Sequence, residues 1–340
     1  MKKDISFIVP MYNAEEYLER TLNSIVEMVG EKQNKVEVLL IDDGSSDETV
    51  MLAKNFSTNY DFFKVIPGKH QGVSGTRNTG IKLAKGEYVT FIDSDDTFRK
   101  NFVTIFESLI TEKPDIVLAD IEVIKHTKSM MNLTIDQKIA LFKLINRGRG
   151  NTGIGSKFFK RSFLEKYALM YDSQIMISED ALFNYQAIDK ATSVVLTPEE
   201  FYYVLASHTL PYYNPNILTS ELRYRKQTAK IFAKYYPYDE NGELLWTDNK
   251  IKLLGYIKLV DRYYGPLYIK KEISLSEATK KLREIAENFD YTGCFKSKAH
   301  DNVLGMRYIV FRNMLKCKLY RTTLVFNKYM DRIKKTQRWK

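Results

Sequence analysis

Residues 86–96 read Gly-Glu-Tyr-Val-Thr-Phe-Ile-Asp-Ser-Asp-Asp, a short apolar run that ends in three carboxylates. The apolar run over 88–92 predicts a buried β-strand, and Gly86 predicts the end of a preceding helix. In open α/β sheets, ligands bind at the carboxyl ends of the strands. The stretch therefore predicts both a strand and a candidate binding site at its end.

Three earlier segments repeat this pattern of a short apolar run followed by polar residues. The runs are 5–9, 36–41 and 62–66, and each precedes a segment with helical periodicity. This alternation is typical of a mainly parallel sheet flanked by helices, so the predicted fold class is α/β. Asn13, with Glu16 three residues later, has the spacing of a capping box and predicts a helix that begins beside it.

The second part of the chain has a different pattern. Residues 134–215 are mixed, and beyond Pro215 the alternation of strand and helix stops. Four helical stretches are predicted near 218–235, 245–264, 274–289 and 301–335. The sequence thus predicts an α/β domain over 1–215 and a mostly helical domain over 216–340.

The net charge of +10 is carried by the end of the chain. Residues 305–340 contain eleven Lys and Arg and one Asp, so residues 1–304 are neutral. Apolar and basic residues interleave in this tail in a way that permits an amphipathic helix. Such a helix could lie on an anionic membrane surface, pack on its own protein, grip an anionic polymer or form a homo-oligomer. No nucleic-acid recognition motif occurs, so nucleic acid is not expected as a partner.

Composition limits the chemistry and the location. Two cysteines, Cys294 and Cys317, exclude a disulfide framework and a zinc site built from several cysteines. The first residues lack the apolar core of a signal peptide, and no apolar stretch is long enough to span a membrane. We therefore expect a cytoplasmic protein whose membrane contact, if any, is peripheral and on the inner face.

Acidic residues are the strongest candidates for chemistry. Asp93, Asp95 and Asp96 repel one another unless a cation or the donors of a ligand offset their charge. Mg²⁺ and Mn²⁺ bind carboxylate oxygens and share their remaining positions with substrate phosphates. The alternative is a solvated turn or helix N-cap, which would also account for the acidic residues in 42–45 and 179–180.

Four ordered motifs within the first 96 residues resemble the family 2 glycosyltransferases, which have the GT-A fold. They are 6–14 (SFIVPMYNA), 40–47 (LIDDGSSD), 77–80 (RNTG) and 86–96 (GEYVTFIDSDD). Residues 157–160 (KFFK) are similar to a later helix of that family, and 178–183 (SEDALF) to its acidic catalytic pair. The remaining third is similar in layout to the bacterial wall teichoic acid β-glycosyltransferases.

The resemblance implies a donor-binding set at the strand ends. Its members are Pro10, Tyr12, Asp42, Asp43, Arg77, Asp93 and Ser94. Pro10 and Tyr12 would flank the nucleoside. Asp42, with Asp43 as the alternative, would hydrogen-bond a uracil base.

The resemblance also implies a divalent metal ion beside the diphosphate. Arg77 would reach the base or the diphosphate, and Asp93 would bind the ribose or the sugar. Asp95 would hold the Mn²⁺ or Mg²⁺ that neutralises the leaving group. His208 is a further candidate ligand because imidazole suits Mn²⁺, with an ordinary surface histidine as the alternative.

The implied catalytic pair is Asp180, as general base, with Glu179 as its neighbour. Direct displacement needs a base for the proton of the acceptor hydroxyl, and it inverts the anomeric configuration. The expected reaction transfers a monosaccharide from a UDP-sugar to a bacterial cell-surface glycan. The acceptor would be a polysaccharide precursor, which can be lipid-linked, or a teichoic acid.

Two alternatives belong to other functional classes. A sugar nucleotidyltransferase also combines an α/β sheet with Mg²⁺, but its glycine-rich basic phosphate loop is missing, since residues 9–13 (VPMYN) occupy that place. A non-catalytic protein that holds polyanions through its basic tail is the second alternative.

Overall fold

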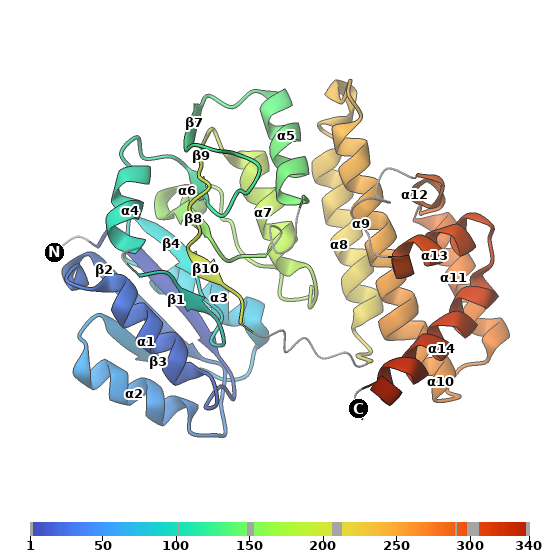
Figure 1. Ribbon diagram of the computed structural model, residues 1–340, viewed down its shortest axis with the longest axis horizontal. Helices are drawn as coiled ribbons and strands as arrows, with labels where there is room; N and C mark the ends of the chain where they lie inside the picture. The colour runs from blue at the N-terminus through green and yellow to red at the C-terminus, as the bar shows by residue number, and fades with distance from the viewer. Residues whose placement is uncertain are drawn as a thin grey trace. The chain divides into compact units, whose positions relative to one another are not determined.

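The computed structural model describes residues 3–100, 102–147, 153–205, 213–289, 291–297 and 306–337. The chain divides into two compact units, residues 1–208 and 209–340. Figure 1 shows that the first unit combines a sheet with helices and that the second is helical. The division falls a few residues before residue 215, where the sequence pattern changes.

An eight-stranded sheet forms the centre of the first unit, with the strand order β3-β2-β1-β4-β8-β6-β9-β7. The first four strands run parallel to one another, and β8 pairs antiparallel with β4. The mainly parallel sheet predicted from the sequence is therefore confirmed. The strands are β1 (Ile5–Met11), β2 (Val36–Asp42), β3 (Phe63–Ile66), β4 (Tyr88–Phe91), β6 (Ile116–Leu118), β7 (Lys128–Met131), β8 (Lys157–Lys160) and β9 (Ser193–Leu196).

Helices cover the two faces of this sheet because side chains alternate along each strand. Phe7 belongs to a buried cluster with residues of α1 and α4, whereas the next residue, Ile8, faces Gly80 of α3. A short second sheet pairs β5 (Thr97–Phe98) with β10 (Tyr202–Tyr203). The helices of the unit are α1 (Leu18–Val29), α2 (Thr49–Asn59), α3 (Gly72–Leu83), α4 (Phe102–Leu109), α5 (Ile135–Ile145), α6 (Arg161–Lys166) and α7 (Glu179–Lys190), with a 3₁₀ turn at Gln33–Lys35.

Two local expectations for this unit are wrong. Helix α1 begins at Leu18, and Asn13 has a positive φ of 47° in the loop before it. The Asn13 side chain accepts a hydrogen bond from the backbone N–H of Ser46 at 2.9 Å, so it joins two loops instead of capping a helix. Residues 157–160, which the resemblance placed in a helix, form β8 because they complete the sheet beside β4.

The second unit contains only helices among its described residues. They are α8 (Ile217–Phe232), α9 (Glu243–Leu259), a π-helical turn (Val260–Tyr264), α10 (Gly265–Ile269), α11 (Leu275–Asn288), α12 (Thr292–Lys296), α13 (Met306–Lys316) and α14 (Tyr320–Gln337), with a 3₁₀ turn at Tyr236–Tyr238. The helical C-terminal region predicted from the sequence is confirmed. Among the residues that the structure describes, no helix has the length and apolar character needed to cross a bilayer.

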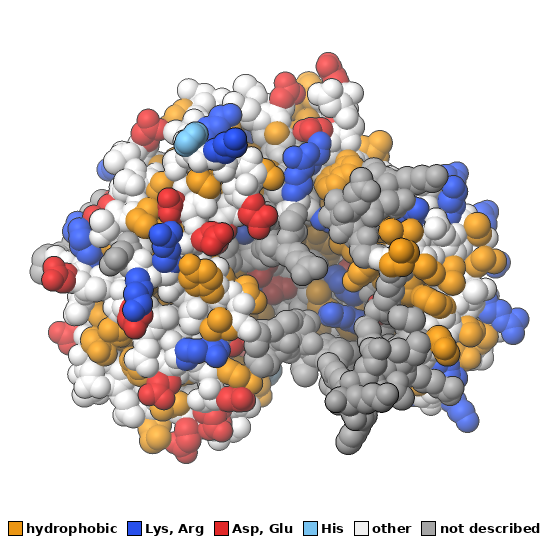
Figure 2. Space-filling model, in the orientation of Figure 1, with side chains coloured by type: hydrophobic (Ala, Val, Ile, Leu, Met, Phe, Trp, Pro, Cys, Tyr) orange, Lys and Arg blue, Asp and Glu red, His pale blue; other side chains and the backbone are white. Residues whose placement is uncertain are grey.

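The basic tail forms two helices instead of the single helix expected over 301–335. The chain turns between α13 and α14, where Lys318 adopts a positive φ of 58°. Phe311, Leu315 and Leu324 are buried, so this segment packs against its own unit. On the face shown in Figure 2, the Lys and Arg side chains of the helical unit are scattered among apolar ones and form no single patch within its described residues.

Candidate active site

The candidate site lies at the carboxyl ends of β1, β2 and β4. Strand β1 lies between β2 and β4. Along the chain, β2 and β3 extend the sheet on one side of β1 and β4 then extends it on the other side, so the direction of extension reverses at β1. A reversal of this kind leaves a crevice outside the strand ends where ligands bind. Tyr12, Asp43 and Asp93 follow the three strands and lie at this edge.

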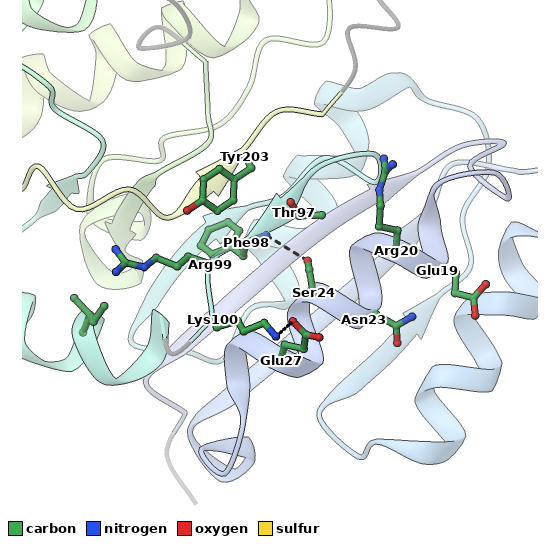
Figure 3. A pocket seen from close by; sticks show the side chains of 11 residues that line it. Glu19, Arg20, Asn23, Ser24, Glu27, Thr97, Phe98, Arg99, Lys100 and Tyr203 are labelled. Atoms are coloured by element: carbon green, nitrogen blue, oxygen red, sulfur yellow. Dashed lines mark hydrogen bonds and ion pairs between the residues drawn. The ribbon is translucent and has the colours of Figure 1, made fainter.

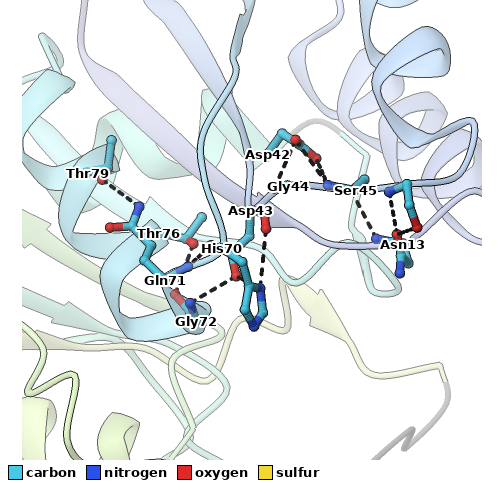
Figure 4. A network of polar contacts seen from close by, with 11 residues as sticks. Asn13, Asp42, Asp43, Gly44, Ser45, His70, Gln71, Gly72, Thr76 and Thr79 are labelled. Carbon is cyan, nitrogen blue, oxygen red and sulfur yellow. Dashed lines mark hydrogen bonds and ion pairs between the residues drawn. The ribbon is translucent and has the colours of Figure 1, made fainter.

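Asp43 joins the loop after β2 to the start of α3 (Figure 4). Its Oδ1 accepts a hydrogen bond from the backbone N–H of Gln71 at 2.7 Å, and its Oδ2 accepts one from Gly72 at 3.0 Å. The first N–H groups of a helix lack intrahelical partners, so a carboxylate is stabilised there. The Nδ1 atom of His70 lies 3.0 Å from the same Oδ2.

Tyr12 and His70 place two exposed rings beside Asp43. Their centroids are 4.8 Å apart, and the Tyr12 residue is 51% exposed. Exposed aromatic rings provide stacking surfaces for nucleobases. Pro10, which the resemblance placed next to Tyr12, is buried within β1 and paired with Ile41. His70 was missed in the sequence because an isolated histidine in a loop carries no pattern.

Asp42 closes the turn that follows β2 (Figure 4). Its carboxylate accepts hydrogen bonds from the backbone N–H groups of Gly44 at 3.0 Å and Ser45 at 3.2 Å. Gly68 approaches the same turn so closely that a Cβ there would lie 2.4 Å from the Asp42 carbonyl oxygen. A carboxylate can accept about four hydrogen bonds. The recognition of a base by Asp42 or Asp43 stays a prediction.

Arg77 brings together the candidate catalytic residues from distant parts of the sequence. Its Nη1 lies 2.7 Å from Asp180 Oδ1 and 3.4 Å from Glu179 Oε1, and its Nη2 lies 2.8 Å from Asp93 Oδ1. The Arg77 side chain is only 3% exposed, whereas that of Asp180 is 21% exposed. The guanidinium thus lies beneath a carboxylate that solvent or a substrate can reach.

The ionisation of this cluster is governed by burial and by the shared guanidinium. Burial raises the pKa of Asp180 to about 7, with Arg77 acting in the opposite direction. Burial also raises the pKa of Glu179, again against the effect of Arg77. The pKa of Arg77 is raised because its carboxylate partners outweigh the cost of burial. A carboxyl group that titrates near neutral pH suits a general base.

Tyr171 forms the floor of the cluster and was not identified from the sequence. The Arg77 guanidinium lies 5.3 Å from the centroid of its ring, and the ring stacks on Phe183 of α7 at 4.4 Å. A cation above an aromatic face is stabilised by the ring quadrupole. The stack of Tyr171 on Phe183 therefore helps to position the Arg77 guanidinium beside α7.

The carboxylates that follow β4 do not converge on one point. Asp93 contacts Arg77, whereas Asp96 is buried and accepts hydrogen bonds from the Tyr202 hydroxyl at 2.6 Å and the Leu205 backbone at 3.2 Å. Burial raises the pKa of Asp96 to about 6, and these hydrogen bonds oppose that effect. Asp93 and Asp96 thus have separate partners, while repulsion from Asp95 and Asp93 adds to the raised pKa of Asp96.

Helix α1 braces the loop that carries these carboxylates. Thr21 Oγ1 donates to the carbonyl oxygen of Ser94 at 2.9 Å, and Arg20 Nη2 donates to that of Asp95 at 3.1 Å. Arg20 also lines an open groove of about 920 Å³ between α1 and β5 (Figure 3). In this groove Ser24 Oγ accepts a hydrogen bond from the Phe98 backbone at 3.3 Å. The donor-binding role of Ser94 stays a prediction.

The expected metal site is only partly defined by the structure. Asp95 is half-buried beside the carboxyl end of β4. His208 lies outside the described residues, so its proposed role stays untested. Within the described ranges no three acidic, His or Cys side chains are grouped so that they could hold a metal ion.

The mainly parallel sheet with its flanking helices has the GT-A fold. The chain belongs to glycosyl transferase family 2, whose sequence profile matches residues 6–183, more than half of its length. This membership favours glycosyl transfer over the two alternatives considered from the sequence.

Particular relatives extend the comparison. EpsH of Bacillus subtilis (strain 168) is 25% identical over 259 residues, which are 73% of this chain and 71% of EpsH. A poly(ribitol-phosphate) beta-glucosyltransferase of Bacillus spizizenii is 29% identical over 213 residues, 59% of this chain but 32% of that longer protein. The structure of S. aureus TarS 1–349 in complex with UDP has a TM-score of 0.62 at 18% identity and covers 97% of this chain and 91% of TarS 1–349. The last likeness shows that the fold is shared along nearly the whole chain.

Proposed function

We propose that this protein is an inverting glycosyltransferase that moves a monosaccharide from a UDP-sugar to a bacterial cell-surface glycan. The observation that carries the proposal is the position of Asp180 in the first turn of α7. Its carboxylate is 21% exposed and is held by the same guanidinium that holds Asp93. A base and a donor-binding carboxylate are thereby kept at a fixed spacing at the edge of the sheet.

The reaction follows from this placement. The acceptor hydroxyl attacks the anomeric carbon while Asp180 takes the hydroxyl proton. The bond between the anomeric carbon and the diphosphate oxygen breaks on the opposite face, so the configuration at that carbon inverts. Arg77 keeps Asp180 oriented through their 2.7 Å contact. Glu179 shares the guanidinium and lies next to the base.

A nucleotide would occupy the loops after β1 and β2. Tyr12 and His70 offer ring surfaces to the base, and Asp42 and Asp43 have acceptor capacity left for its N–H group. UDP as the nucleotide is supported by the TarS complexes, which contain UDP and UDP-GlcNAc.

The residues at the end of β4 fit a hard divalent cation. Asp95 would hold Mn²⁺ or Mg²⁺ through carboxylate oxygens, and the diphosphate would complete the coordination. When bound, the ion offsets the negative charge that grows on the leaving diphosphate. Ions of this kind are commonly held by one or two carboxylates and substrate phosphates, so a larger cluster of protein ligands is not required.

The acceptor class is supported by the relatives. Poly(ribitol-phosphate) beta-glucosyltransferase and the minor teichoic acid biosynthesis protein GgaA of Bacillus subtilis both match this chain over more than half of its length. A teichoic acid is therefore the first acceptor to test, with a polysaccharide precursor as the second. With such acceptors, the protein would work in the cytoplasm, at the inner face of the membrane.

A panel of UDP- and GDP-sugars, each with Mn²⁺, Mg²⁺ or EDTA, tests the proposal through nucleotide release. We expect release from at least one UDP-sugar, with stimulation by the metal ions and by a teichoic acid acceptor. The configuration of the new linkage, read by NMR, should be β when the donor is α-linked. Retention of configuration would contradict the assignment of Asp180 as the base.

A further inference from the structure

Lys157 is a buried cation to which the reaction described above gives no role. The residue is 5% exposed at the start of β8. Its Nζ donates one hydrogen bond, 3.3 Å long, to the carbonyl oxygen of Gly155, and it forms no ion pair within 4.0 Å with any residue that the structure describes. A buried ammonium group without a close counter-ion costs free energy. Its retention in the core therefore calls for a functional reason.

The position of Lys157 in the sheet turns its side chain toward the catalytic helix. Strand β8 pairs antiparallel with β4, so Lys157 lies at the end of β4 that leads to Asp93. Alternate residues of a strand share a face, and Phe159 on the face of Lys157 packs against Phe183 of α7 at 5.2 Å. Lys157 thus lies on the side of the sheet covered by α7, whose first turn carries Asp180.

The charged groups around Lys157 are acidic. Burial lowers its pKa to about 8, while Asp180 and Asp120 oppose this effect. Asp120 follows β6 and also accepts a hydrogen bond from the Phe201 backbone at 2.8 Å. The ammonium therefore interacts electrostatically with the candidate base and with a second carboxylate that already has a backbone partner.

The charged groups that face Asp180 come from four elements. Arg77 approaches from α3, Asp93 from the loop after β4, Glu179 from α7 itself and Lys157 from β8. Two of these groups are cations and two are carboxylates. Without Lys157, Arg77 would be the one cation of this set left beside the carboxyl groups of Asp93, Glu179 and Asp180.

Three of the non-glycine residues with a positive φ lie among or next to these groups, and others occur elsewhere in the molecule. Asp120, Ser156 and Ser178 have positive φ values of 59°, 58° and 73°. Ser156 precedes Lys157, and Ser178 precedes the acidic pair of α7. Such conformations persist only where the surrounding structure imposes them, and they cluster at functional sites.

We propose that Lys157 is a positioning residue that acts with Arg77 to keep Asp180 ionised so that it can accept the proton of the acceptor. The proposal rests on the proposed function, because it takes Asp180 to be the base. Removal of the positive charge at residue 157 makes protonation of Asp180 easier. The loss of activity at low pH should then extend to higher pH.

The test compares Lys157→Met with Lys160→Met. Lys160 is a matched control because it lies on the same strand and its Nζ also donates a 3.3 Å hydrogen bond to a carbonyl oxygen, that of Lys113, but at an exposed position. In the pH profile of nucleotide release, we expect the acid limb of Lys157→Met to move up by about one pH unit, a shift typical of losing one nearby opposite charge. Lys160→Met and the charge-conserving Lys157→Arg should keep the wild-type limb.

Thermal unfolding separates this role from a structural one. A methionine at residue 157 removes an unpaired buried charge, so we expect Lys157→Met to unfold at the wild-type temperature or above it. An unchanged acid limb together with a lower unfolding temperature would show that Lys157 only supports the fold. If Lys157→Met fails to fold, Lys157→Gln supplies the same comparison with a neutral polar side chain.

A second readout does not depend on activity. The Asp180 carboxyl can be followed by ¹³C NMR in protein labelled at the Asp carboxyl carbons, with its signal assigned through Asp180→Asn. A higher titration midpoint for Asp180 in Lys157→Met supports the proposal, and the same midpoint as in wild type overturns it. Absence of nucleotide release from wild type with every donor would reject the proposed function. The titration would still show whether Lys157 lowers the pKa of the Asp180 carboxyl.

Discussion

Arg77 is the residue on which the candidate site depends, since one guanidinium contacts Asp93, Glu179 and Asp180. These carboxylates come from positions 16, 102 and 103 residues away along the chain. The attraction between a buried cation and its carboxylates offsets the cost of removing these charges from water only while every partner is present. Any change at Arg77 therefore affects stability and the state of the base together.

We predict that Arg77→Met destabilises the protein by about 3–5 kcal/mol, the usual cost of breaking a buried ion pair. The methionine leaves three partly buried carboxylates without the guanidinium that they share. Denaturant unfolding of the first unit measures the loss. The control is Arg99→Met, which breaks an exposed 3.0 Å pair with Glu199 and should cost less than about 1 kcal/mol. Equal losses in the two variants would show that the Arg77 cluster does not stabilise the fold.

The rings of Tyr12 and His70 lead to a prediction about nucleotide binding. Tyr12→Ala should weaken UDP binding by about 1–3 kcal/mol, the range for losing one stacked base contact. Isothermal titration calorimetry with UDP measures this change. Tyr238→Ala is the control, because Tyr238 is 52% exposed, as Tyr12 is at 51%, but belongs to the helical unit. Unchanged affinity in Tyr12→Ala would exclude this surface as the site of the base.

At the scale of single residues, the sequence predicts the candidate site residues that belong to a recognisable motif. Arg77, Asp93 and Asp180 could be identified because their motifs occur in order, and the structure places them in contact. His70 could not be identified because it is a single residue in an uninformative loop. Lys157 belongs to a segment that resembles the family, but the resemblance placed that segment in a helix and gave Lys157 no role. Their surroundings depend on which strands become neighbours, and that is settled only by the tertiary fold.

At the scale of elements, apolar periodicity predicts where strands and helices occur but not how they begin. The spacing of Asn13 and Glu16 matches a capping box, yet Asn13 bonds to Ser46, 33 residues away. A contact over this distance in the sequence is invisible to a local pattern. Residues 157–160 show the same limit, since a run this short becomes a strand only because β4 and β6 lie on either side of it.

The packing of α3 on β1 gives a prediction for a single element. A Cβ on Gly80 would lie 2.4 Å from Cγ2 of Ile8, and a β-branched side chain in a strand cannot easily move aside. Gly80→Ala should therefore destabilise the first unit by about 1–3 kcal/mol through overpacking. Denaturant unfolding is the measurement.

Gly293→Ala provides the comparison for this variant. Gly293 lies in α12. Outside its own turn of helix, no atom of the described residues lies within 4 Å of the position that an alanine methyl group would take, so alanine there should be neutral or stabilising. If both alanine variants were neutral, the close contact between α3 and β1 would not be a constraint on the fold.

At the scale of the whole molecule, composition predicts a basic tail but not which of its side chains are buried and which are exposed. The structure shows that its apolar residues Phe311, Leu315 and Leu324 are buried, while Lys316, Lys318 and Arg321 are exposed. Packing on its own unit is therefore one role of this segment. Contact of the exposed charges with an anionic surface stays a separate hypothesis.

Two variants separate these roles. Deletion of residues 306–340 should expose the apolar surfaces that α13 and α14 cover, so we expect loss of cooperative unfolding of the helical unit, or aggregation. The triple variant Lys316→Gln, Lys318→Gln and Arg321→Gln should keep the fold and reduce sedimentation with anionic vesicles at low salt, at about 1 kcal/mol per engaged charge. Vesicle binding that the triple variant leaves unchanged would exclude these residues as a membrane anchor.

The central claim is that Asp180 acts as the base of an inverting sugar transfer, and Asp180→Asn tests it most directly. Donor affinity is measured by calorimetry, and nucleotide release is measured under the same conditions. We expect the affinity to stay near that of wild type while the rate falls by about 10² to 10⁴, the range for losing a general base. A variant that releases nucleotide at the wild-type rate, or that no longer binds the donor, would contradict the account.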